Sequence, residues 1–583
     1  MPQSLPPRAH VQAFKDRPRA EVLVVGGGIN GVATFRDLAL QGVDVALVER
    51  GDYCQGASGA SSHMIHGGIR YLENGEFRLV KESVAERNGL LAIAPHHVKP
   101  LRTTIPVFST FSGILGAPLR FLRHRNGRPT ERGAVLIKAG LVMYDCFAGL
   151  RAGRRTPWHS FHGRRKSLAA LPRLRPDVKY TATYFDASVH NPERLTLDVL
   201  QSGLEAHPAA RASNYLGLVR HDADGAVLRD ELTGEEFRFQ ADVVVNATGA
   251  WADLTNDSVG RPSAFMGGTK GSHIVLDHPE LLRATGGREI FFEHRDGRIV
   301  LIYPIGDRVL VGTTDIEADM TEDPVCTDDE TRYFFELIRH VFPDIAVGRD
   351  DIVYTFSGVR PLPRHADTQP GFVSRDYRIE RTLLAGGTPM LTLVGGKWTT
   401  FRALAEHLAR DVLAESGRTR TVQTQDLAIG GGRDYPLDPA ALEDWFTRRV
   451  GRADRRRLEV LLERYGTGAD RVLEHCGAGD RPLRACDELT VGELGYLARH
   501  EQAARLVDVF IRRTSLAFRG LVTNALLEEA ATVLARHHGW DEAETAAEVE
   551  HARDVLRRRH GVRLSDEATP ARATASGRDP LPA

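Results

Sequence analysis

The amino-acid sequence predicts an α/β protein with a parallel sheet, a region of short strands and a separate helical domain toward the C-terminus. Valine- and leucine-rich runs at residues 21–25 and 43–49 are typical of parallel strands that are buried on both faces. Short strand-like segments dominate residues 265–360. Beyond about residue 430 glycine becomes less frequent, and helical periodicity takes over, as in residues 501–518.

The length and composition limit the classes of function. A chain of 583 residues allows about three domains. Its net charge of −1 leaves no basic excess, so we expect no nucleic-acid partner. The five cysteines include no CxxC pair, which predicts neither a metal site nor a disulfide framework and fits a reducing cytoplasm. No segment approaches the roughly 18 apolar residues of a spanning helix, and residues 1–20 lack a secretory h-region.

A glycine turn follows the first strand. It reads Gly26-Gly-Gly-Ile-Asn-Gly31, and a helix is expected through residues 32–41. In such a G-x-G-x-x-G turn, one glycine permits the tight bend, one lets the backbone approach a pyrophosphate, and one lets the helix pack against the strand. Glu49 ends the next strand, 23 residues after Gly26, close to where a ribose ligand is expected. The turn predicts a Rossmann-like dinucleotide-binding unit, and alone it does not decide between FAD and NAD.

Glycine-rich strand ends recur far downstream, at residues 246–249 and 395–396. An NAD-binding domain usually ends well before this point, whereas a long cofactor can be held by several returning segments. This recurrence favours FAD bound by a discontinuous domain.

The block Ala57-Ser-Gly-Ala-Ser-Ser-His-Met-Ile-His-Gly-Gly-Ile-Arg-Tyr-Leu-Glu73, together with the glycine turn, closely resembles the FAD-dependent glycerol-3-phosphate dehydrogenases of the quinone-linked, aerobic type. The resemblance extends over about residues 21–540. Further matching segments are 246–249, 270–273, 312–315, 357–362, 395–400 and 507–518.

The resemblance implies a Rossmann-like, discontinuous FAD-binding domain, an α+β substrate domain on an antiparallel sheet, and a helical C-terminal domain that would include a helix at 524–537. We expect a disordered leader at 1–20, an FAD-binding part at about 21–108, 180–260 and 355–430, a substrate part at about 109–180 and 260–355, the helical domain at 431–560, and a disordered tail at 561–583.

The resemblance also implies the reaction. A hydride would pass from C2 of sn-glycerol 3-phosphate to flavin N5, giving dihydroxyacetone phosphate, and the electrons would pass to a quinone. The phosphate calls for guanidinium or ammonium groups. By similarity, Arg70, Tyr71 and Thr314 would hold the phosphate end. Arg360 and Lys397 would bind the substrate near the flavin and polarise the developing C2 oxygen. The alternative for these cations is ordinary surface charge.

Histidine is the side chain best suited to accept a proton at neutral pH. His273 is the first candidate and His66 the second, because both stand in matched segments. Either could instead orient the substrate or contact the flavin. The residues expected to bind the cofactor are Gly26, Gly28, Asn30, Gly31, Glu49, Ser58, Ser61, Ser62, His66, Gly67, Gly249, Gly396, Lys397 and Thr399.

The three possible functions differ in the electron acceptor that the reduced flavin would use. A quinone requires contact with a membrane, whereas a related oxidase would use oxygen, and a flavoprotein without catalysis would use neither. Residues 108–138 combine an apolar segment with Arg120, Arg123, Arg125 and other cations, which suits an anionic lipid surface. A buried helix with a solvated basic face is the other interpretation. We expect a cytoplasmic homodimer that lies peripherally on the inner face of the cell membrane.

Overall fold

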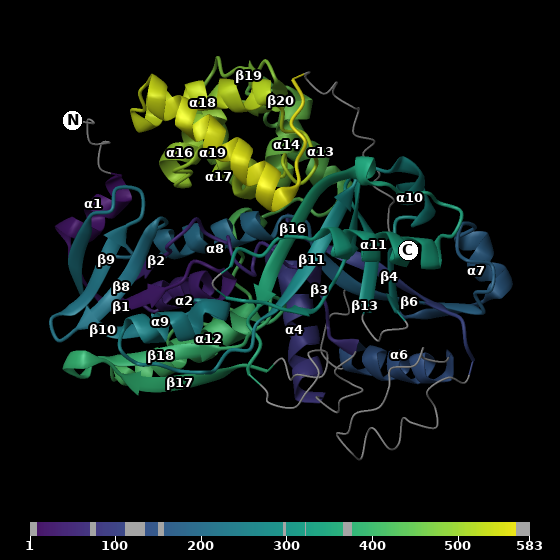
Figure 1. Cartoon of the computed structure of the whole chain (residues 1–583), viewed down its shortest axis with the longest axis horizontal. Helices are drawn as coiled ribbons and strands as arrows, with labels where there is room; N and C mark the ends of the chain where they lie inside the picture. Colours follow the sequence, from purple (N-terminus) through teal and green to yellow (C-terminus); the bar gives the residue numbers. More distant parts are fainter. Residues whose placement is uncertain are drawn as a thin grey trace.

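A computed structural model of the chain places two sheets side by side, and the C-terminal helices cover both from one side (Figure 1). The predicted phosphate contacts Arg70 and Tyr71 lie outside the described residues, as do residues 111–133 of the apolar and basic stretch. The structure describes residues 8–69, 77–110, 134–149, 157–294, 299–320, 322–364 and 376–566.

The first sheet is built around five parallel strands, of which β1 and β10 are central. Its apolar strands are buried on both faces, since α2, α8 and α12 cover one face and α1 with a β-hairpin covers the other. Segments from three distant parts of the chain meet here, as predicted for a discontinuous Rossmann-like domain. In spatial order the sheet comprises β17 (Arg378–Leu383), β18 (Pro389–Val394), β10 (Glu236–Asn246), β1 (Arg19–Val25), β2 (Val45–Val48) and β7 (Arg211–Ser213), with the hairpin β8 (Leu216–Asp222) and β9 (Gly225–Asp230) beside β10; its helices are α1 (Ala9–Asp16), α2 (Ile29–Leu40), α8 (Pro192–Ala206), α9 (Ala252–Ser258) and α12 (Phe401–Glu415).

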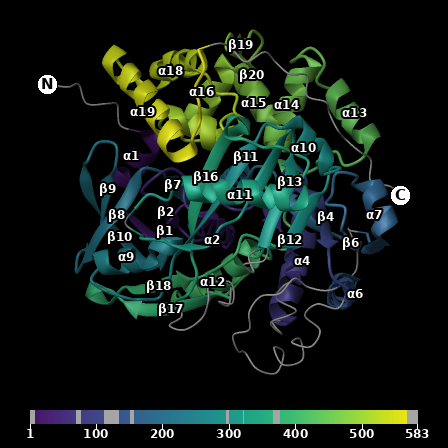
Figure 2. The same ribbon diagram turned by 45° about the vertical axis from the view of Figure 1, so that its right-hand side comes forward.

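The second sheet is antiparallel except for one parallel pair, β4 with β12. Helix α11 lies across one face of it (Figure 2), and the opposite face turns toward the C-terminal helices. This arrangement confirms the predicted α+β part. In spatial order its strands are β15 (Ile316–Glu317), β11 (Thr269–Leu276), β14 (Arg308–Gly312), β13 (Ile299–Ile305), β12 (Glu289–Glu293), β4 (Val98–Val107), β6 (Tyr180–Val189) and β3 (Met64–Ile65), with β16 (Ile352–Arg360) beside β11 and β5 (Ser160–Gly163) beside β6; its helices are α10 (Pro279–Ala284), α11 (Asp328–Val341), α4 (Phe77–Ile93), α6 (Ala134–Gly149) and α7 (Arg164–Ala170).

The boundaries between the two predicted parts are wrong at four strands. β3, β4, β6 and β16 were expected wholly or largely in the FAD-binding part, but all four belong to the second sheet. β4 and β6 pair with each other along their whole length, from Val98 opposite Val189 to Val107 opposite Tyr180. Such a long-range pairing is invisible to hydrophobic periodicity, which marks a strand but not its neighbour.

The leader is partly ordered, which corrects a second expectation. Residues 9–16 form α1, and its Val11 and Phe14 are buried. The ring of Phe14 lies 5.5 Å from that of Phe239, while Arg8 pairs with Asp230. This helix covers an apolar patch of the first sheet, so its few apolar residues suffice to anchor it.

The C-terminal domain is helical, as predicted, and the expected helix at 524–537 is present as α18. The helix expected across 501–518 is not continuous, because only a short α-helical turn and a π-helical turn at Val509–Arg513 occupy it. Its main elements are α13 (Pro439–Thr447), α14 (Arg455–Tyr465), α15 (Ala469–Cys476), β19 (Pro482–Leu483), β20 (Cys486–Thr490), α16 (Val491–His500), α17 (Leu506–Asp508), α18 (Asn524–His538) and α19 (Glu542–His560).

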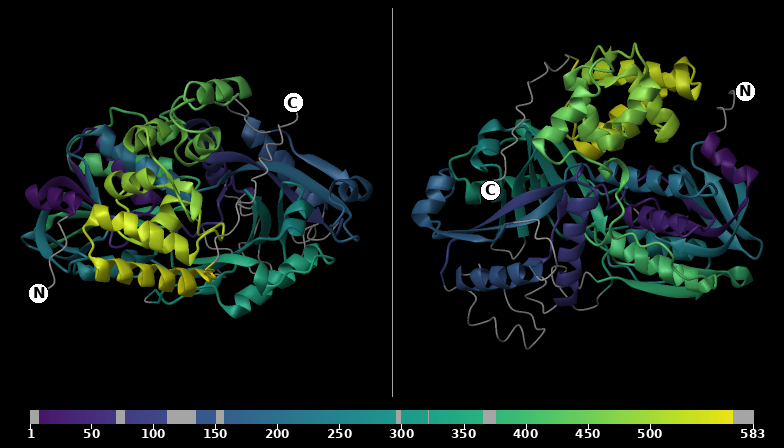
Figure 3. Two further views of the ribbon diagram at one scale, coloured as in Figure 1. Left: turned by 90° about the horizontal axis from the view of Figure 1, so that it is seen from above. Right: turned by 180° about the vertical axis from the view of Figure 1, so that it is seen from behind.

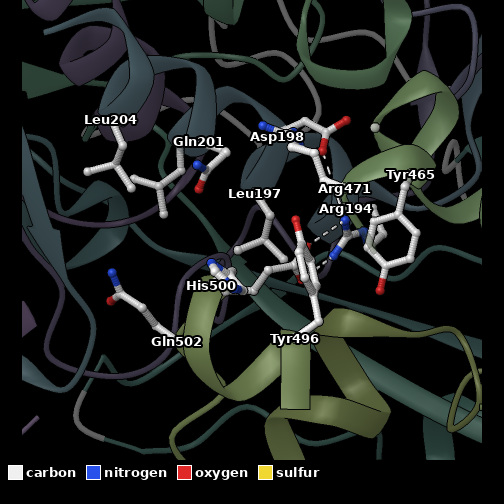
Figure 4. Close-up of a pocket in the computed structure, with 13 residues that line it drawn as sticks. Arg194, Leu197, Asp198, Gln201, Leu204, Tyr465, Arg471, Tyr496, His500 and Gln502 are labelled. Atoms are coloured by element: carbon white, nitrogen blue, oxygen red, sulfur yellow. Dashed lines mark hydrogen bonds and ion pairs between the residues drawn. The ribbon is translucent and has the colours of Figure 1, made fainter. Parts of the chain in front are cut away.

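An ion pair ties this domain to the first sheet. Arg194 of α8 donates to both carboxylate oxygens of Glu501, at 2.5 and 3.0 Å, and stands 4.5 Å from the ring of Tyr465 (Figure 4).

The view from behind shows α4 and α6 on the opposite side of the molecule from the C-terminal helices (Figure 3). Among the described helices, none combines the length and the apolar character that crossing a membrane requires.

Candidate active site

The glycine turn after β1 is shaped by close backbone contacts. Gly26 has a φ of +112°, and a Cβ there would stand 2.6 Å from the carbonyl oxygen of Ala247. A Cβ at Gly31 would overlap the carbonyl oxygen of Gly26. Both positions therefore require glycine, and together they bring the start of α2 against the ends of β1 and β10.

Asn30, Ser58 and Gly396 meet at the N-terminus of α2. The backbone N–H of Ile29 donates to Ser58 Oγ at 3.0 Å, and a Cβ at Gly396 would lie 2.8 Å from Asn30 Nδ2. Within the described residues, the buried Oδ1 of Asn30 has no hydrogen-bond partner. A helix N-terminus lined by glycine and small polar groups is suited to an anionic pyrophosphate.

Glu49 lies at the end of β2, beside the same turn. Its carboxylate accepts the N–H of Gly27 at 2.6 Å and that of Gly51 at 2.8 Å. Burial raises the pKa of Glu49, while the two backbone donors oppose that shift. A carboxylate held in this way has lone pairs left for ribose hydroxyls. The cradle that a Cβ would fill, the helix N-terminus and this acid together fit the phosphates and ribose of a dinucleotide.

Residues 57–62, here called the serine loop, run from the cofactor turn to the second sheet. Near one end, Ser58 also accepts a hydrogen bond from Trp398 Nε1 through its carbonyl oxygen at 2.8 Å. At the other end, Ser62 Oγ lies 2.8 Å from His273 Nε2. Between them, Ala60 packs where a Cβ at Gly358 would stand, 2.5 Å from the Ala60 Cβ. The loop therefore connects the predicted cofactor site directly to the predicted catalytic histidine.

His273 sits in the middle of β11 with its ring on the face toward the serine loop. A Cβ at Gly312 of the adjacent strand would overlap this ring, so glycine makes room for it. The ring stacks on Phe356 with centroids 4.7 Å apart. The imidazole is only 2% exposed. Burial lowers the pKa of His273 well below its usual range, and the positive charge of Arg360 adds to the effect, so the ring is neutral at pH 7.

Arg360, at the end of β16, lies over Gly271 of β11, where any side chain would collide with its guanidinium. The guanidinium donates to Thr313 Oγ1 and to the Thr314 carbonyl oxygen, each at 2.9 Å, and pairs with Asp315 at 3.0 Å. These bonds fix the cation close to His273. His273 and Arg360 thus form a rigid pair of a neutral imidazole and a fixed positive charge.

Thr314 takes part in this arrangement through its backbone. Its hydroxyl donates to Glu330 at 2.6 Å and accepts the N–H of Ser272 at 2.9 Å. The side chain is buried, at 1% exposed. Because its hydrogen is already donated to Glu330, the geometry gives Thr314 a supporting place under Arg360.

The remaining predicted residues lie around these two centres. Lys397 follows Gly396 in the turn before α12, with its Nζ 3.5 Å from Ser83 Oγ of α4. Gly67 N donates to Asp186 at 2.9 Å, and a Cβ at this glycine would overlap the hydroxyl of Tyr144. Ser61 Oγ accepts the N–H of His63 at 3.3 Å, and Gly249 has a φ of +63°. Thr399 is buried just before α12, and His66 is half-buried just after β3.

Two buried carboxylates at the edges of the site escaped sequence reasoning. Asp52 follows Glu49 by three residues and accepts from Arg512, Arg513 and Asn214. Glu330 lies under β11, on the opposite face from His273. The segment Thr327–Glu330 has the form of a capping box, which predicts a helix start and gives no sign of the additional bonds.

One group of side chains among the described residues has metal-ligand types, namely His96, His97 and Asp198. His96 Nε2 lies 2.7 Å from Asp198 Oδ2, which is a hydrogen-bond distance. Arg194 stands 3.9 Å from the other oxygen of that carboxylate. A histidine–aspartate hydrogen bond accounts for this geometry.

Comparison with known proteins identifies the family. A family model described as FAD dependent oxidoreductase matches residues 21–410, and one described as the C-terminal domain of alpha-glycerophosphate oxidase matches residues 422–545. A glycerol-3-phosphate dehydrogenase of Synechocystis sp. is 32% identical over 564 residues, 92% of this chain and 96% of that protein. The aerobic glycerol-3-phosphate dehydrogenase of Escherichia coli is 32% identical over 532 residues, 87% of this chain and 95% of that protein.

The fold has a counterpart among solved structures. The glycerol-3-phosphate dehydrogenase from Bacillus halodurans, solved with FAD, superposes with a TM-score of 0.70 at 21% identity, over 94% of this chain and 97% of that one. The matched family models and the relatives decide the assignment: the chain belongs to the family of FAD-dependent oxidoreductases that contains the glycerol-3-phosphate dehydrogenases, and FAD is its cofactor.

Proposed function

We propose that the protein oxidises sn-glycerol 3-phosphate to dihydroxyacetone phosphate and that the electrons pass on to a quinone. The observation that carries the proposal is the neutral, buried His273, fixed beside Arg360 and joined by the serine loop to the cofactor turn. FAD, when bound, supplies the hydride acceptor. The names of the relatives supply the substrate.

The residues divide the work in the proposed reaction. Arg360 stabilises negative charge on the C2 oxygen, because its guanidinium is held by Thr313 and Asp315 and needs no rearrangement. His273 accepts the hydroxyl proton at Nε2. This nitrogen lies within hydrogen-bond distance of the Ser62 hydroxyl, which belongs to the half-buried serine loop. Arg70 and Tyr71, with Lys397, remain the predicted groups for the substrate's polar ends.

An anaerobic titration tests the proposal. Glycerol 3-phosphate should bleach the absorbance of the oxidised flavin. His273→Ala should slow this bleaching by about 10²–10⁴-fold, the usual contribution of a general base, with a much smaller change in substrate affinity. His66→Ala serves as the comparison, since His66 is the second candidate for the base. No bleaching by saturating glycerol 3-phosphate would refute the substrate assignment, and wild-type rates in His273→Ala would refute the role of His273.

A glycerol-3-phosphate oxidase is the second candidate function, because the family model matched by residues 422–545 takes its description from alpha-glycerophosphate oxidase. The two functions differ in the fate of the reduced flavin. An oxidase would consume oxygen and release hydrogen peroxide at the rate of substrate turnover. A dehydrogenase would turn over slowly in oxygen and rapidly with a soluble quinone. A non-catalytic flavin-binding subunit would show neither reaction.

Peripheral binding to the cytoplasmic face of the membrane completes the proposal, and the surface of α6 supports it. Val135, Val142 and Met143 are 49, 45 and 41% exposed and share one face of this apolar helix, since they are seven and eight positions apart. The basic stretch immediately precedes this helix in the sequence. An apolar face next to cations suits an anionic lipid surface.

Flotation with anionic and with neutral vesicles tests this surface. We expect the protein to float with anionic vesicles at low salt, and Val142→Asp combined with Met143→Asp to abolish flotation without reducing FAD content. If the protein stays at the bottom of the gradient with both vesicle types, α6 is not a membrane-binding surface. Sedimentation equilibrium of the holoenzyme tests the expected homodimer.

A further inference from the structure

Glu330 is a buried carboxylate on the face of the second sheet opposite the site. It is the third residue of α11 and is 3% exposed. Thr327 caps the helix, and its N–H donates to Glu330 Oε2 at 2.8 Å. This capping box would be complete with two bonds. Glu330 also accepts from Lys270 and Ser272 of β11, the strand that carries His273, and from Thr314 of the segment after β14.

The additional bonds go to three residues, of which Ser272 and Thr314 lie beside the site. Glu330 Oε1 accepts from Ser272 Oγ at 2.7 Å and from Thr314 Oγ1 at 2.6 Å. Oε2 accepts from Lys270 Nζ at 2.9 Å. These hydrogen bonds outweigh burial and hold the pKa of Glu330 below its usual range, so the carboxylate stays charged.

Each of the two residues leads to one functional group. Ser272 precedes His273 directly in β11, and its N–H donates to Thr314 Oγ1 at 2.9 Å. Thr314 carries the carbonyl oxygen that accepts from Arg360 at 2.9 Å. Ser272 Oγ also lies 2.7 Å from Ser357 Oγ, opposite it on β16, the strand that ends in Arg360. One carboxylate thus gathers the three backbone segments that carry the base and the cation.

We infer that Glu330 is a positioning residue: from behind the sheet, its carboxylate sets the spacing between His273 and Arg360 through Ser272 and Thr314. The inference rests on the proposed function for the meaning of that spacing. Without the carboxylate, Ser272 and Thr314 would each lose a shared acceptor, and the carbonyl oxygen of Thr314 could turn away from Arg360. A displacement of about 1 Å at a reacting group can cost about 100-fold in rate.

Glu330→Gln separates positioning from capping. Glutamine also serves at the third position of a capping box, so α11 keeps its start. Its amide offers one acceptor oxygen and one donor nitrogen, so it cannot accept from Ser272 and Thr314 on one side and from Lys270 on the other. Thr327→Ala removes the cap and leaves Oε1 intact, and Lys270→Met removes only the ammonium. Both are matched controls on the holoenzyme.

The first measurement is the rate of flavin reduction at saturating glycerol 3-phosphate, with the substrate dissociation constant from the same stopped-flow series. We expect Glu330→Gln to slow reduction by about 10- to 100-fold and to change the dissociation constant by less than about threefold. Thr327→Ala should lower the melting temperature and leave the reduction rate near wild type. Equal reduction rates in Glu330→Gln and wild type would overturn the inference, and so would an equal loss of rate in Thr327→Ala.

The second measurement does not depend on turnover. A crystal structure of Glu330→Gln with FAD bound should show the Arg360 guanidinium separated from the Thr314 carbonyl oxygen, with His273 and Ser62 no longer in hydrogen-bond contact. Unchanged contacts would overturn the inference even if the rate fell. If the wild-type flavin is not reduced by glycerol 3-phosphate, the proposed function fails while this structural comparison still tests the role of Glu330.

Discussion

The two ends of the serine loop are fixed in opposite ways. On the cofactor side, Asp52 and Asp508 are paired with Arg512 and Arg513, and all four side chains are buried. On the substrate side, the buried group is His273, which is neutral. The first region holds two carboxylates against two arginines, and the second holds the neutral ring of His273 beside the guanidinium of Arg360.

The cofactor side and the substrate side differ in which group can take up a proton near neutral pH. The two arginines hold the pKa of Asp52 well below its usual range despite its burial, so this carboxylate stays ionised at any physiological pH. The cluster joins the segment of Asp52 to the C-terminal domain. The pKa of His273 lies well below its usual range, so its ring is neutral, and in the proposed reaction it takes up the proton that the substrate hydroxyl releases.

The largest effect is expected from removing the charge of Asp52. Asp52→Asn removes the carboxylate that pairs with both Arg512 and Arg513 in a buried site. Breaking a buried ion pair in this way costs about 3–5 kcal/mol. We expect a large fall in the free energy of unfolding and release of FAD at lower denaturant, because Asp52 lies next to the segment of Glu49.

Denaturant unfolding followed by flavin fluorescence measures this effect. Glu415→Gln is the control, since its pair with Arg381 lies on the surface and should contribute little. If Asp52→Asn unfolds and releases FAD at the same denaturant concentration as Glu415→Gln, the cluster does not stabilise the cofactor side.

A smaller effect is expected from acid. Burial lowers the pKa of His63, His190 and His560 to about 4. The unfolded chain protonates these rings near pH 6.5, whereas the folded chain does not, so their contribution to stability is complete above pH 6.5 and is lost as the pH falls toward 4. Each unit by which folding lowers the pKa of a ring corresponds to at most about 1.4 kcal/mol of unfolding free energy.

Unfolding curves at pH 7 and pH 5 check the sign. We expect a lower midpoint at pH 5 and a smaller pH dependence in His560→Gln, because the amide can replace the bond from His560 to the Thr355 carbonyl oxygen without binding a proton. A midpoint that rises between pH 7 and pH 5 would contradict the neutral state of these buried histidines.

Much of the fold could be predicted because its elements are local. The strand, glycine turn and helix around Gly26 follow from residue patterns within about 30 positions. The pairing of β4 with β6 spans some 80 residues, and α1 is held by Phe239 and Asp230, more than 200 residues away. Interactions over such distances leave no periodic pattern in the sequence, so the part boundaries and the ordered leader were missed.

The same division applies to the site. His273 and Arg360 could be named because they stand in motifs, and the structure brings them together. Asp52 and Glu330 could not, because their meaning depends on partners such as Arg512 and Thr314 that fold back from other segments. The break of the helix at Val509–Arg513 has the same origin, since its arginines turn toward Asp52.

In the proposed reaction, His273 is the neutral base that accepts the substrate proton. The most direct measurement is the rate of flavin reduction at saturating glycerol 3-phosphate between pH 5.5 and pH 8, in the wild type and in His273→Ala. Because the pKa of His273 lies well below its usual range, the wild-type rate should not fall with an apparent pKa near 6.5. His273→Ala should be about 100-fold slower or more at every pH. If the wild-type rate falls with an apparent pKa near 6.5, or if the His273→Ala rate is within a few-fold of wild type, His273 is not the neutral base that accepts the proton.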